Sequence, residues 1–215
     1  MKATLIAVTQ PLIEEASSAK ELISYCARLS NPVNQSNMET SDKLLSYLMK
    51  HKHWSPLEMA NAVVEVEAPR DIARQLLRHR SFSFQEFSQR YADVASLGNS
   101  FCIREARLQD TKNRQNSIAL GDMSDLTIEW QRRQKEILSI VESHYRWAIE
   151  NGLAKEVARV ILPEGLTMSR LYVNGTIRSW IHYLNVRMEE GVTQKEHVIL
   201  ANLIAEQITK AFPIK

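Results

Sequence analysis

Residues 78–91 place three arginines, a histidine, a glutamate and three phenylalanines within fourteen positions. An arginine guanidinium is always charged and offers five donors in a fixed plane, so it is stable near apolar surface only beside an anionic partner. Arginines interleaved with phenylalanines therefore predict a half-buried anion pocket that suits a phosphate-bearing ligand. A solvated face, or a helix end where cations offset the dipole, is the plainer interpretation of such a stretch and stays open at this point.

The composition indicates a globular protein with only local anion sites. Its 215 residues suggest a single domain covering residues 1–215. Apolar residues make up 44%, charged residues 24%, and the net charge is only +2, which argues against a binder of bulk polyanions such as nucleic acid. No stretch approaches 18 apolar residues and no signal pattern opens the chain, so we expect a cytoplasmic protein that does not span a membrane.

The cysteines and histidines do not form an obvious metal or disulfide framework. Cys26 and Cys102 lie far apart and form no CxxC pair, which disfavours a disulfide scaffold or a zinc ribbon and fits a reducing compartment. Cys26 falls on an apolar helical stripe, so we interpret it as a core residue and not as a nucleophile. His51 and His53 lack a third ligand at a useful spacing, so we expect no metal site.

Hydrophobic periodicity divides the chain into strands and helices. It predicts strands at residues 3–9, 61–68 and 101–104, and a strand or bend at 166–173. It predicts helices after Ser18 and Ser41, from residue 69 towards 79, and at 124–151, 154–162, 176–187 and 193–210. Residues 109–124 are polar and are expected to form a long loop or short helical turns.

Local signals add detail to these elements. Ser18 and Thr193 each stand three residues before a glutamate, the spacing of a capping box. Asn174-Gly175 is typical of a turn. The helix predicted for 124–151 has an apolar stripe, and such length is common at an interface between helices or subunits. The stripe comprises Trp130, Ile137, Ile140, Val141, Tyr145, Ala148 and Ile149.

Two further arginine-containing patterns favour an anionic ligand. Arg159 lies among Val157, Val160 and Ile161, and an arginine in such apolar surroundings requires an anionic partner. Gln75 and Arg78 are three residues apart, so they lie on neighbouring faces of one helix. With His79, they are expected at the mouth of whatever the following loop encloses.

Four blocks of the sequence, in the same order, resemble signatures of the flavin-dependent thymidylate synthases. Residues 78–80, Arg-His-Arg, followed by Ser88 and Arg90, resemble the family's RHR and Ser-x-Arg motif. Residues 51–58 resemble its second flavin-contacting stretch, residues 158–163 its nucleotide-contacting helix end, and residues 174–187 its C-terminal signature. Gln194 and Glu196 follow this last block.

The resemblance implies a fold and a reaction. The implied fold is α+β, with a mixed or antiparallel sheet and a helical bundle, assembled as a homotetramer whose active sites are shared between subunits. The implied reaction is reductive methylation of dUMP to dTMP. In it, 5,10-methylenetetrahydrofolate gives the carbon, and NADPH supplies electrons through bound FAD.

The resemblance also implies residue roles. Residues implied to bind dUMP are Gln75, Arg78, Glu86, Ser88, Gln89, Arg90, Arg159 and Arg187. Residues implied to bind FAD are His53, Ser55, Arg78, His79, Arg80, Glu86, Thr176, Ile177, Arg178 and His182. His53 and Ser55 would come from a neighbouring subunit, with His53 also near the folate. Arg187 is implied as the catalytic residue, because its fixed cation would stabilise negative charge on the uracil ring.

The chain departs from the family pattern in three places. Other members carry asparagine at the position of Thr176, and many have a histidine or similar group within the link at residues 188–193. Residues 92–123 match no segment that the resemblance assigns. The first two differences concern the detailed flavin contacts and not the reaction.

Other chemistries compete with the one that this resemblance implies. Addition of a cysteine to the uracil ring is disfavoured, because Cys26 and Cys102 lie in apolar or strand contexts far from the arginines. Ser88 has no evident histidine–carboxylate pair to activate it as a nucleophile. A nucleic-acid module that stacks bases on the phenylalanines, and a zinc hydrolase built on three histidines (His51, His53 and His79), stay open as alternatives. The chain has no P-loop or GxGxxG motif.

Overall fold

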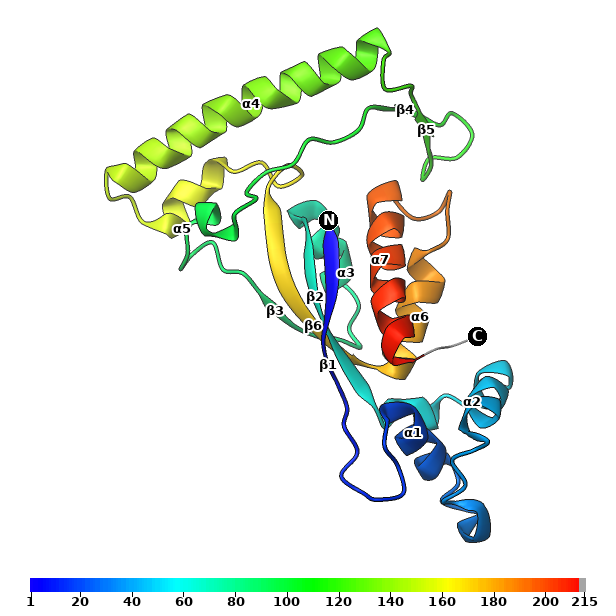
Figure 1. Cartoon of the computed structure of the whole chain (residues 1–215). Helices are drawn as coiled ribbons and strands as arrows, with labels where there is room; N and C mark the ends of the chain where they lie inside the picture. Colours follow the sequence, from blue (N-terminus) through cyan, green and yellow to red (C-terminus); the bar gives the residue numbers. More distant parts are fainter. Residues whose placement is uncertain (213–215) are drawn as a thin grey trace.

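The computed structural model describes residues 1–212. Its centre is a four-stranded sheet with helices packed against it, and a long helix runs along one side (Figure 1). The strands are β1 (Lys2–Val8), β2 (Asn61–Pro69), β3 (Ser83–Glu86), β4 (Arg107–Gln109), β5 (Ser117–Ala119) and β6 (Met168–Thr176). The α-helices are α1 (Ala19–Ala27), α2 (Ser41–Lys50), α3 (Arg70–Leu77), α4 (Asp125–Glu150), α5 (Lys155–Ala158), α6 (Ile177–Arg187) and α7 (Lys195–Ala211). Four short 3₁₀ turns are η1 (Pro32–Asn34), η2 (Ser55–Glu58), η3 (Val94–Leu97) and η4 (Arg159–Ile161).

The central sheet is antiparallel throughout, with the order β1-β2-β6-β3. Alternation along β2 explains its two faces, because Val64 and Val66 are fully buried while Glu65 and Glu67, which alternate with them, are partly exposed. Helices α3, α6 and α7 cover the apolar face. The largest core side chains there are Ile72, Leu76, Leu171, Ile177, Trp180, Tyr183, Leu200 and Ile204. The predicted α+β class is confirmed, and of the two sheet types predicted, mixed or antiparallel, the central sheet has the antiparallel one.

Helix starts that depend on a single side chain were predicted well. The hydroxyls of Ser18, Ser124 and Thr176 accept hydrogen bonds from backbone N–H groups three residues on, at 3.3, 3.2 and 3.2 Å. The strands predicted at 3–9 and 61–68 are β1 and β2. The capping box predicted at Ser18 differs in one hydrogen bond. The carboxylate of Glu21 accepts from the N–H of Ser17, at 2.7 Å, where a capping box has the N–H of the cap residue itself.

Two predicted helix caps are wrong. Gln194, and not Thr193, precedes the first turn of α7, and the Thr193 hydroxyl donates to a backbone carbonyl on α6. The carboxylate that was to complete the capping box, Glu196, turns instead towards Arg107. Ser41 is the first residue of α2, not its cap. For Thr193 and Glu196, hydrogen-bond partners outside the first turn override the local capping signal. For Ser41, the helix simply begins one residue earlier than predicted.

Asn174 and Gly175 do not form the predicted turn but lie inside β6, which covers most of residues 166–173, predicted as a strand or bend. Residues of β6 pair with β2 on one side and β3 on the other, so backbone pairing outweighs the local turn preference. Gly175 serves a different purpose here. A Cβ at this position would lie 2.2 Å from the Phe82 ring, so only glycine lets that ring pack against β6.

The segment at 92–123 differs from its prediction. Residues 101–104 do not form a strand; Phe101 makes a single bridge to Thr167. A small hairpin, β4–β5, replaces the loop expected at 109–124. Its turn is built on Asp110, whose carboxylate accepts from the backbone N–H groups of Lys112 and Asn113 at 2.8 and 3.1 Å.

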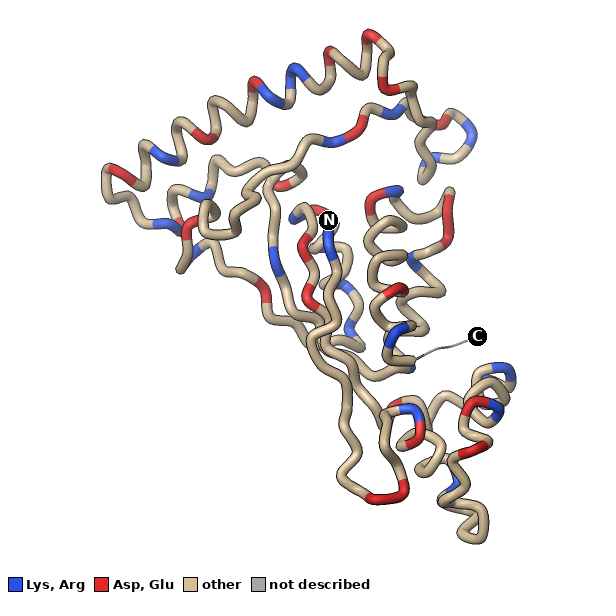
Figure 2. The backbone as a smooth tube through the Cα atoms, viewed as in Figure 1, with Lys and Arg blue, Asp and Glu red and all other residues tan. Residues whose placement is uncertain are grey.

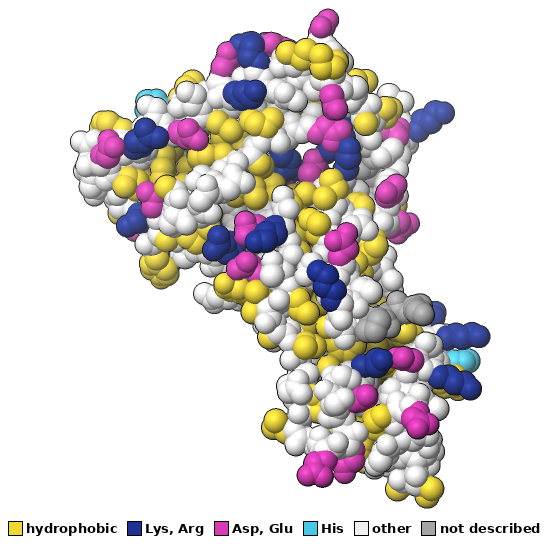
Figure 3. Space-filling model, in the orientation of Figure 1, with side chains coloured by type: hydrophobic (Ala, Val, Ile, Leu, Met, Phe, Trp, Pro, Cys, Tyr) yellow, Lys and Arg dark blue, Asp and Glu magenta, His cyan; other side chains and the backbone are white. Residues whose placement is uncertain are grey.

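Helix α4 lies apart from the core, and much of its predicted apolar stripe is exposed (Figures 1 and 3). Trp130, Ile137 and Ile140 are 42, 47 and 59% exposed, whereas Tyr145 and Ala148 are buried. None of the helices described in residues 1–212 combines the length and apolarity needed to cross a bilayer.

The helix predicted at 154–162 is shorter than expected. It is a single turn, α5, followed by the 3₁₀ turn η4 that begins at Arg159. The apolar neighbours of Arg159 are not core residues, because Val157, Val160 and Ile161 are 53, 76 and 40% exposed. The exposed apolar side chains of α4, α5 and η4, three elements that contact one another, thus form an exposed apolar surface.

The close approach of Phe82 to Gly175 generates the first prediction. Gly175→Ala should destabilise the protein by about 2 kcal/mol or more, because an added methyl group must displace a packed aromatic ring. Chemical denaturation measures this free energy of unfolding. Gly165→Ala is the matched control, since a Cβ there has nothing within 4 Å and the change should be close to neutral. Equal stability of the two variants would contradict the packing described.

Candidate active site

The end of α6 and the residues just beyond α3 meet in a half-buried contact. Arg187 donates through Nε to Nε2 of His79 at 2.9 Å. The His79 ring packs edge-on against Tyr183, with centroids 5.0 Å apart. Burial, followed by the charges of Arg187 and His182, lowers the pKa of His79 to about 4. His79 is therefore a neutral acceptor at pH 7, and the terminal nitrogens of Arg187 remain as donors for a ligand.

Gln75, one turn earlier on α3, joins a buried chain of polar groups that leads to α7. Its Nε2 donates to Oε1 of Gln194 at 2.7 Å, and its Oε1 lies 3.1 Å from Nδ1 of His197. Nε2 of His197 lies 3.1 Å from the hydroxyl of Tyr183. Burial, followed by the charge of Arg187, lowers the pKa of His197 to about 3, so this imidazole is also neutral at pH 7.

His197 and Tyr183 join the predicted site residue Gln75 in one chain of polar contacts, which the motifs did not reveal. Both are fully buried, and both lie on apolar helical stripes, where core residues are expected. The available signal was their polarity, because a buried imidazole and a buried phenol each require a hydrogen-bond partner. Neither the partner's identity nor the facing helix could be read from spacing alone.

A cavity of about 450 Å³ opens near this contact, between η2 and the first turns of α6. It is lined by Trp54, Glu58, Ser81, Arg178, Ser179, Ile181, His182 and Asn185. Arg178 and His182, two of the predicted flavin contacts, therefore share one cavity, and Arg178 pairs with Glu58. Thr176 uses its hydroxyl as the cap of α6. Ile177 is 1% exposed and its N–H donates to the carbonyl of Ala60, so its side chain offers no surface to a ligand in this chain.

The other predicted flavin contacts lie at the surface of the single chain. His53 and Ser55 are exposed at the turn after α2, and Arg78 and Arg80 are exposed beyond α3. The rings of His51 and His53 lie 6.2 Å apart. Within residues 1–212 no third carboxylate, thiol or imidazole joins them as a possible metal ligand.

A second group of polar side chains lies at the other end of β3. Glu86 accepts through Oε1 from the Ser169 hydroxyl at 2.7 Å and from Arg70 at 3.4 Å. Ser88 opens a turn in which its carbonyl accepts from two backbone N–H groups at 3.0 Å. This arrangement positions a carboxylate and a hydroxyl near the start of the Ser-Gln-Arg segment, residues 88–90.

Gln89, Arg90 and Arg159 complete the second group. Gln89 is 4% exposed, and its Nε2 has no hydrogen-bond partner among the described residues. Arg90 lies 3.5 Å from Glu156, and both side chains are more than half exposed. The charge of Arg159 adds to burial in lowering the pKa of Arg70. Arginines on these segments, together with a buried N–H donor that has no partner, suit a bound anion.

The predicted site residues therefore fall into two groups joined by β3. Gln75, His79, His182 and Arg187 gather at the α3–α6 end, and the other group gathers towards α5. The hydrogen bonds and ion pairs described above run within each group. Figure 2 shows acidic residues interspersed with basic ones along the coloured part of the chain, whereas the nucleic-acid alternative calls for a continuous basic stripe.

The family model described as thymidylate synthase complementing protein matches residues 11–214. The chain belongs to this family. A probable flavin-dependent thymidylate synthase of Paramecium bursaria Chlorella virus 1 is 48% identical over 213 residues, covering 99% of this chain and 96% of that protein. A flavin-dependent thymidylate synthase of Synechocystis sp. is 44% identical over 217 residues, with coverage of 99% and 96%. These matches confirm the family resemblance stated from the motifs.

A solved structure shares the fold. The UMP/dUMP methylase PolB from Streptomyces cacaoi, bound with 5-Br dUMP, has a TM-score of 0.80 and 25% sequence identity. The match covers 99% of this chain and 91% of PolB. The thymidylate synthase complementing fold thus extends over nearly the whole chain, including segment 92–123.

The two neutral histidines generate a prediction about acid stability. An unfolded histidine titrates near its ordinary pKa of about 6.5, whereas His79 and His197 titrate near 4 and 3 in the folded protein. Between these values the unfolded state binds more protons, so stability should fall as the pH drops from about 6.5 towards 3.

His197→Gln tests this directly, because glutamine keeps a donor and an acceptor but does not titrate. The loss of unfolding free energy between pH 7 and 5 should shrink by about 1–2 kcal/mol in this variant. His144→Gln, at an exposed position on α4, should keep the wild-type dependence. A wild-type protein whose denaturation midpoint is unchanged between pH 7 and 5 would show that the buried histidines do not behave as described.

Proposed function

We propose that this chain is a flavin-dependent thymidylate synthase that methylates dUMP to dTMP. In the full proposal, 5,10-methylenetetrahydrofolate is the carbon donor, and NADPH is the reductant through FAD. The observation that carries the proposal is the Arg187 guanidinium held by a neutral His79, in a chain 44–48% identical to proteins of that name. The dUMP methylase with the same fold supports the choice of substrate.

The residues around the α6 cavity fit a flavin. A cavity of about 450 Å³ is of the size that takes a flat polycyclic ligand. Trp54 and Ile181 form apolar parts of the cavity wall, while Arg178 and His182 offer hydrogen-bond donors to the carbonyl and phosphate oxygens of FAD. Exposed Arg78 and Arg80, with His53 and Ser55 of a neighbouring subunit, would hold the remainder. Bound FAD supplies hydride chemistry, which belongs to the cofactor.

The second group of side chains fits the nucleotide. Gln89 has an unpaired buried N–H donor, and Arg90 and Arg159 supply fixed positive charge. Guanidinium groups bind phosphate with two parallel hydrogen bonds, which set its orientation as well as its charge balance. The dUMP phosphate and sugar would lie here, with Arg90 exchanging its exposed partner Glu156 for the phosphate. Gln75 and Arg187 would approach the same nucleotide.

Arg187 would be the catalytic residue. Methylation requires the uracil C5 to become nucleophilic, which places negative charge on the ring when N3–H is polarised or deprotonated. A guanidinium fixed by His79 stabilises that charge without reorganising during the reaction. A cysteine nucleophile does not fit, because burial raises the pKa of the Cys26 and Cys102 thiols and so reduces their thiolate fraction.

A homotetramer with shared sites would bring the two groups together. The exposed apolar surface of α4, α5 and η4 includes Trp147 at 58% and Val160 at 76% exposed, and exposed apolar patches of this kind mark protein interfaces. His53 and Ser55 are exposed in the single chain. Subunits packed through this surface would place the turn of one copy beside the arginines of another.

The decisive experiment is a dUMP-dependent assay of NADPH oxidation with added FAD and methylenetetrahydrofolate. The protein should purify yellow, with flavin absorbance near about 450 nm, and should form dTMP at a rate that depends on dUMP. A colourless protein that does not bind added FAD, or a yellow one that forms no dTMP, would refute the proposal.

Arg187→Ala should lower turnover by about 100- to 1000-fold, the usual cost of removing one group that stabilises transition-state charge. FAD absorbance and FAD affinity should change little, because the flavin residues proposed above are other side chains. Steady-state kinetics and flavin titration measure the two effects separately. Near-normal turnover in this variant would remove Arg187 from the catalytic role.

A subunit-mixing experiment tests whether His53 and Arg187 of one active site come from different subunits. Arg187→Ala and His53→Ala subunits, each of low activity alone, are co-expressed with different tags and co-purified. If His53 and Arg187 of one site come from different subunits, about one site in four regains both side chains. Mixed oligomers with no more activity than either parent would contradict sharing.

A further inference from the structure

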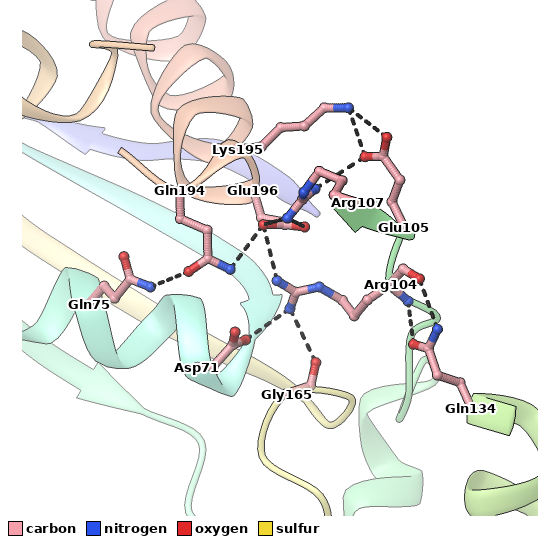
Figure 4. Close-up of polar contacts among 10 residues, drawn as sticks. All are labelled: Asp71, Gln75, Arg104, Glu105, Arg107, Gln134, Gly165, Gln194, Lys195 and Glu196. Carbon is pink, nitrogen blue, oxygen red and sulfur yellow. Dashed lines mark hydrogen bonds and ion pairs between the residues drawn. The ribbon is translucent and has the colours of Figure 1, made fainter. Parts of the chain in front are cut away.

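A cluster of charged and amide side chains links the unassigned segment at 92–123 to α7 and α3 (Figure 4). Its centre is Glu196, which is 8% exposed. One carboxylate oxygen lies 2.7 Å from Nη2 of Arg107, and the other lies 3.3 Å from Nη2 of Arg104. Burial alone would raise the pKa of Glu196, but hydrogen bonds from its backbone and Arg107, with the charge of Arg104, lower it overall. Glu196 is therefore ionised at pH 7.

An ionised carboxylate can only accept hydrogen bonds, and this fixes the direction of the chain that begins there. Nε2 of Gln194 donates to Glu196 at 3.0 Å, so Oε1 of Gln194 is left to accept from Nε2 of Gln75 at 2.7 Å. Oε1 of Gln75 must then accept from Nδ1–H of His197 at 3.1 Å. The unprotonated Nε2 of His197 accepts from the Tyr183 hydroxyl at 3.1 Å.

We propose that Glu196 is a positioning residue which sets the direction of this hydrogen-bond chain and thereby holds the Gln75 amide in one orientation towards the nucleotide. The inference rests on the proposed function, in which Gln75 contacts dUMP. A glutamine side-chain amide can rotate by 180°, exchanging its oxygen and nitrogen, at little cost in free energy when its neighbours can both donate and accept hydrogen bonds. Here the carboxylate removes that freedom, and Arg104 and Arg107 keep the carboxylate charged.

The same contacts indicate a structural role for segment 92–123. Arg104 pairs with Asp71 at the start of α3, at 2.9 Å, as well as with Glu196. Arg107 opens the β4–β5 hairpin. The segment thus supplies the two cations that offset a buried negative charge close to the proposed site, which would otherwise be costly to bury.

The test measures the tautomer of His197 by ¹⁵N NMR of histidine-labelled protein, with His197→Gln used to assign the signal. The wild-type protein should show the Nδ1–H tautomer. In Glu196→Gln the amide can donate as well as accept, so both chain directions become possible. The Nε2–H tautomer should then appear, and the Kd for dUMP should rise about tenfold.

Glu105→Gln is the matched control. Glu105 also contacts Arg107, at 3.2 Å, and Lys195 at 2.7 Å, but it lies outside the chain. This variant should keep the wild-type tautomer and dUMP affinity. Gln194→Leu leaves Glu196 and its arginines in place and interrupts the chain at a second point, which keeps the test available if Glu196→Gln does not fold. In this variant too, the Nε2–H tautomer of His197 should appear.

The proposal would be overturned if the His197 tautomer were unchanged in both Glu196→Gln and Gln194→Leu, or if the Kd for dUMP were unchanged in both. It would also be overturned if Glu105→Gln changed the tautomer and the Kd as much as Glu196→Gln does, because the cluster would then only anchor the hairpin. Failure of the wild-type protein to bind dUMP would contradict the proposed function. The tautomer comparison needs no ligand, so it separates the two failures.

Discussion

Backbone pairing along β6 holds together segments that are far apart in the sequence. This strand forms an antiparallel ladder with β2 over nine residue pairs and with β3 over four. β3 lies within the arginine-rich stretch at residues 78–91, and β6 runs directly into α6, which ends at Arg187. Because buried backbone groups must be paired, the register leaves these segments little freedom relative to one another. The contact between Arg187 and His79 depends on that register, as does the packing of Phe82 on Gly175.

Burial then determines the protonation of the groups that the fold collects. A protonated His79 beside Arg187 would place two positive charges in a half-buried space, so the neutral imidazole is favoured and becomes an acceptor. His197 is neutral for the same reasons, of which burial is the largest. Glu196 is the opposite case, a buried group kept charged because Arg104 and Arg107 lie beside it. Negative charge at Glu196 therefore stands at one end of a chain of neutral polar side chains that ends at Tyr183, and the Tyr183 ring packs against the His79 that holds the positively charged Arg187.

Local signals predicted what depends on neighbouring residues. Ser124 and Thr176 cap their helices because each needs only a backbone N–H three positions on, and β2 follows its alternating pattern. Signals failed where a distant partner competes. Gly175 is predicted in a turn but lies inside β6, where it pairs with Ala62 of β2. Glu196 is predicted in a capping box but pairs with Arg107, 89 positions earlier. For the site, the motifs identified Arg187 and His79 by type but did not reveal that they bond to each other.

The amino-acid sequence by itself determined the family, because the motifs that mark it need no coordinates. Through that resemblance it also gave the α+β class and the residue types proposed for the site. Only the tertiary structure decided which of those residues share an environment. It showed that His197 and Tyr183 belong with Gln75, and that residues 92–123 supply counter-charges for Glu196. Hydrogen-bond direction and pKa depend on which groups lie within a few ångströms, and that proximity arises from chain segments whose separation in sequence gives no measure of their distance in space.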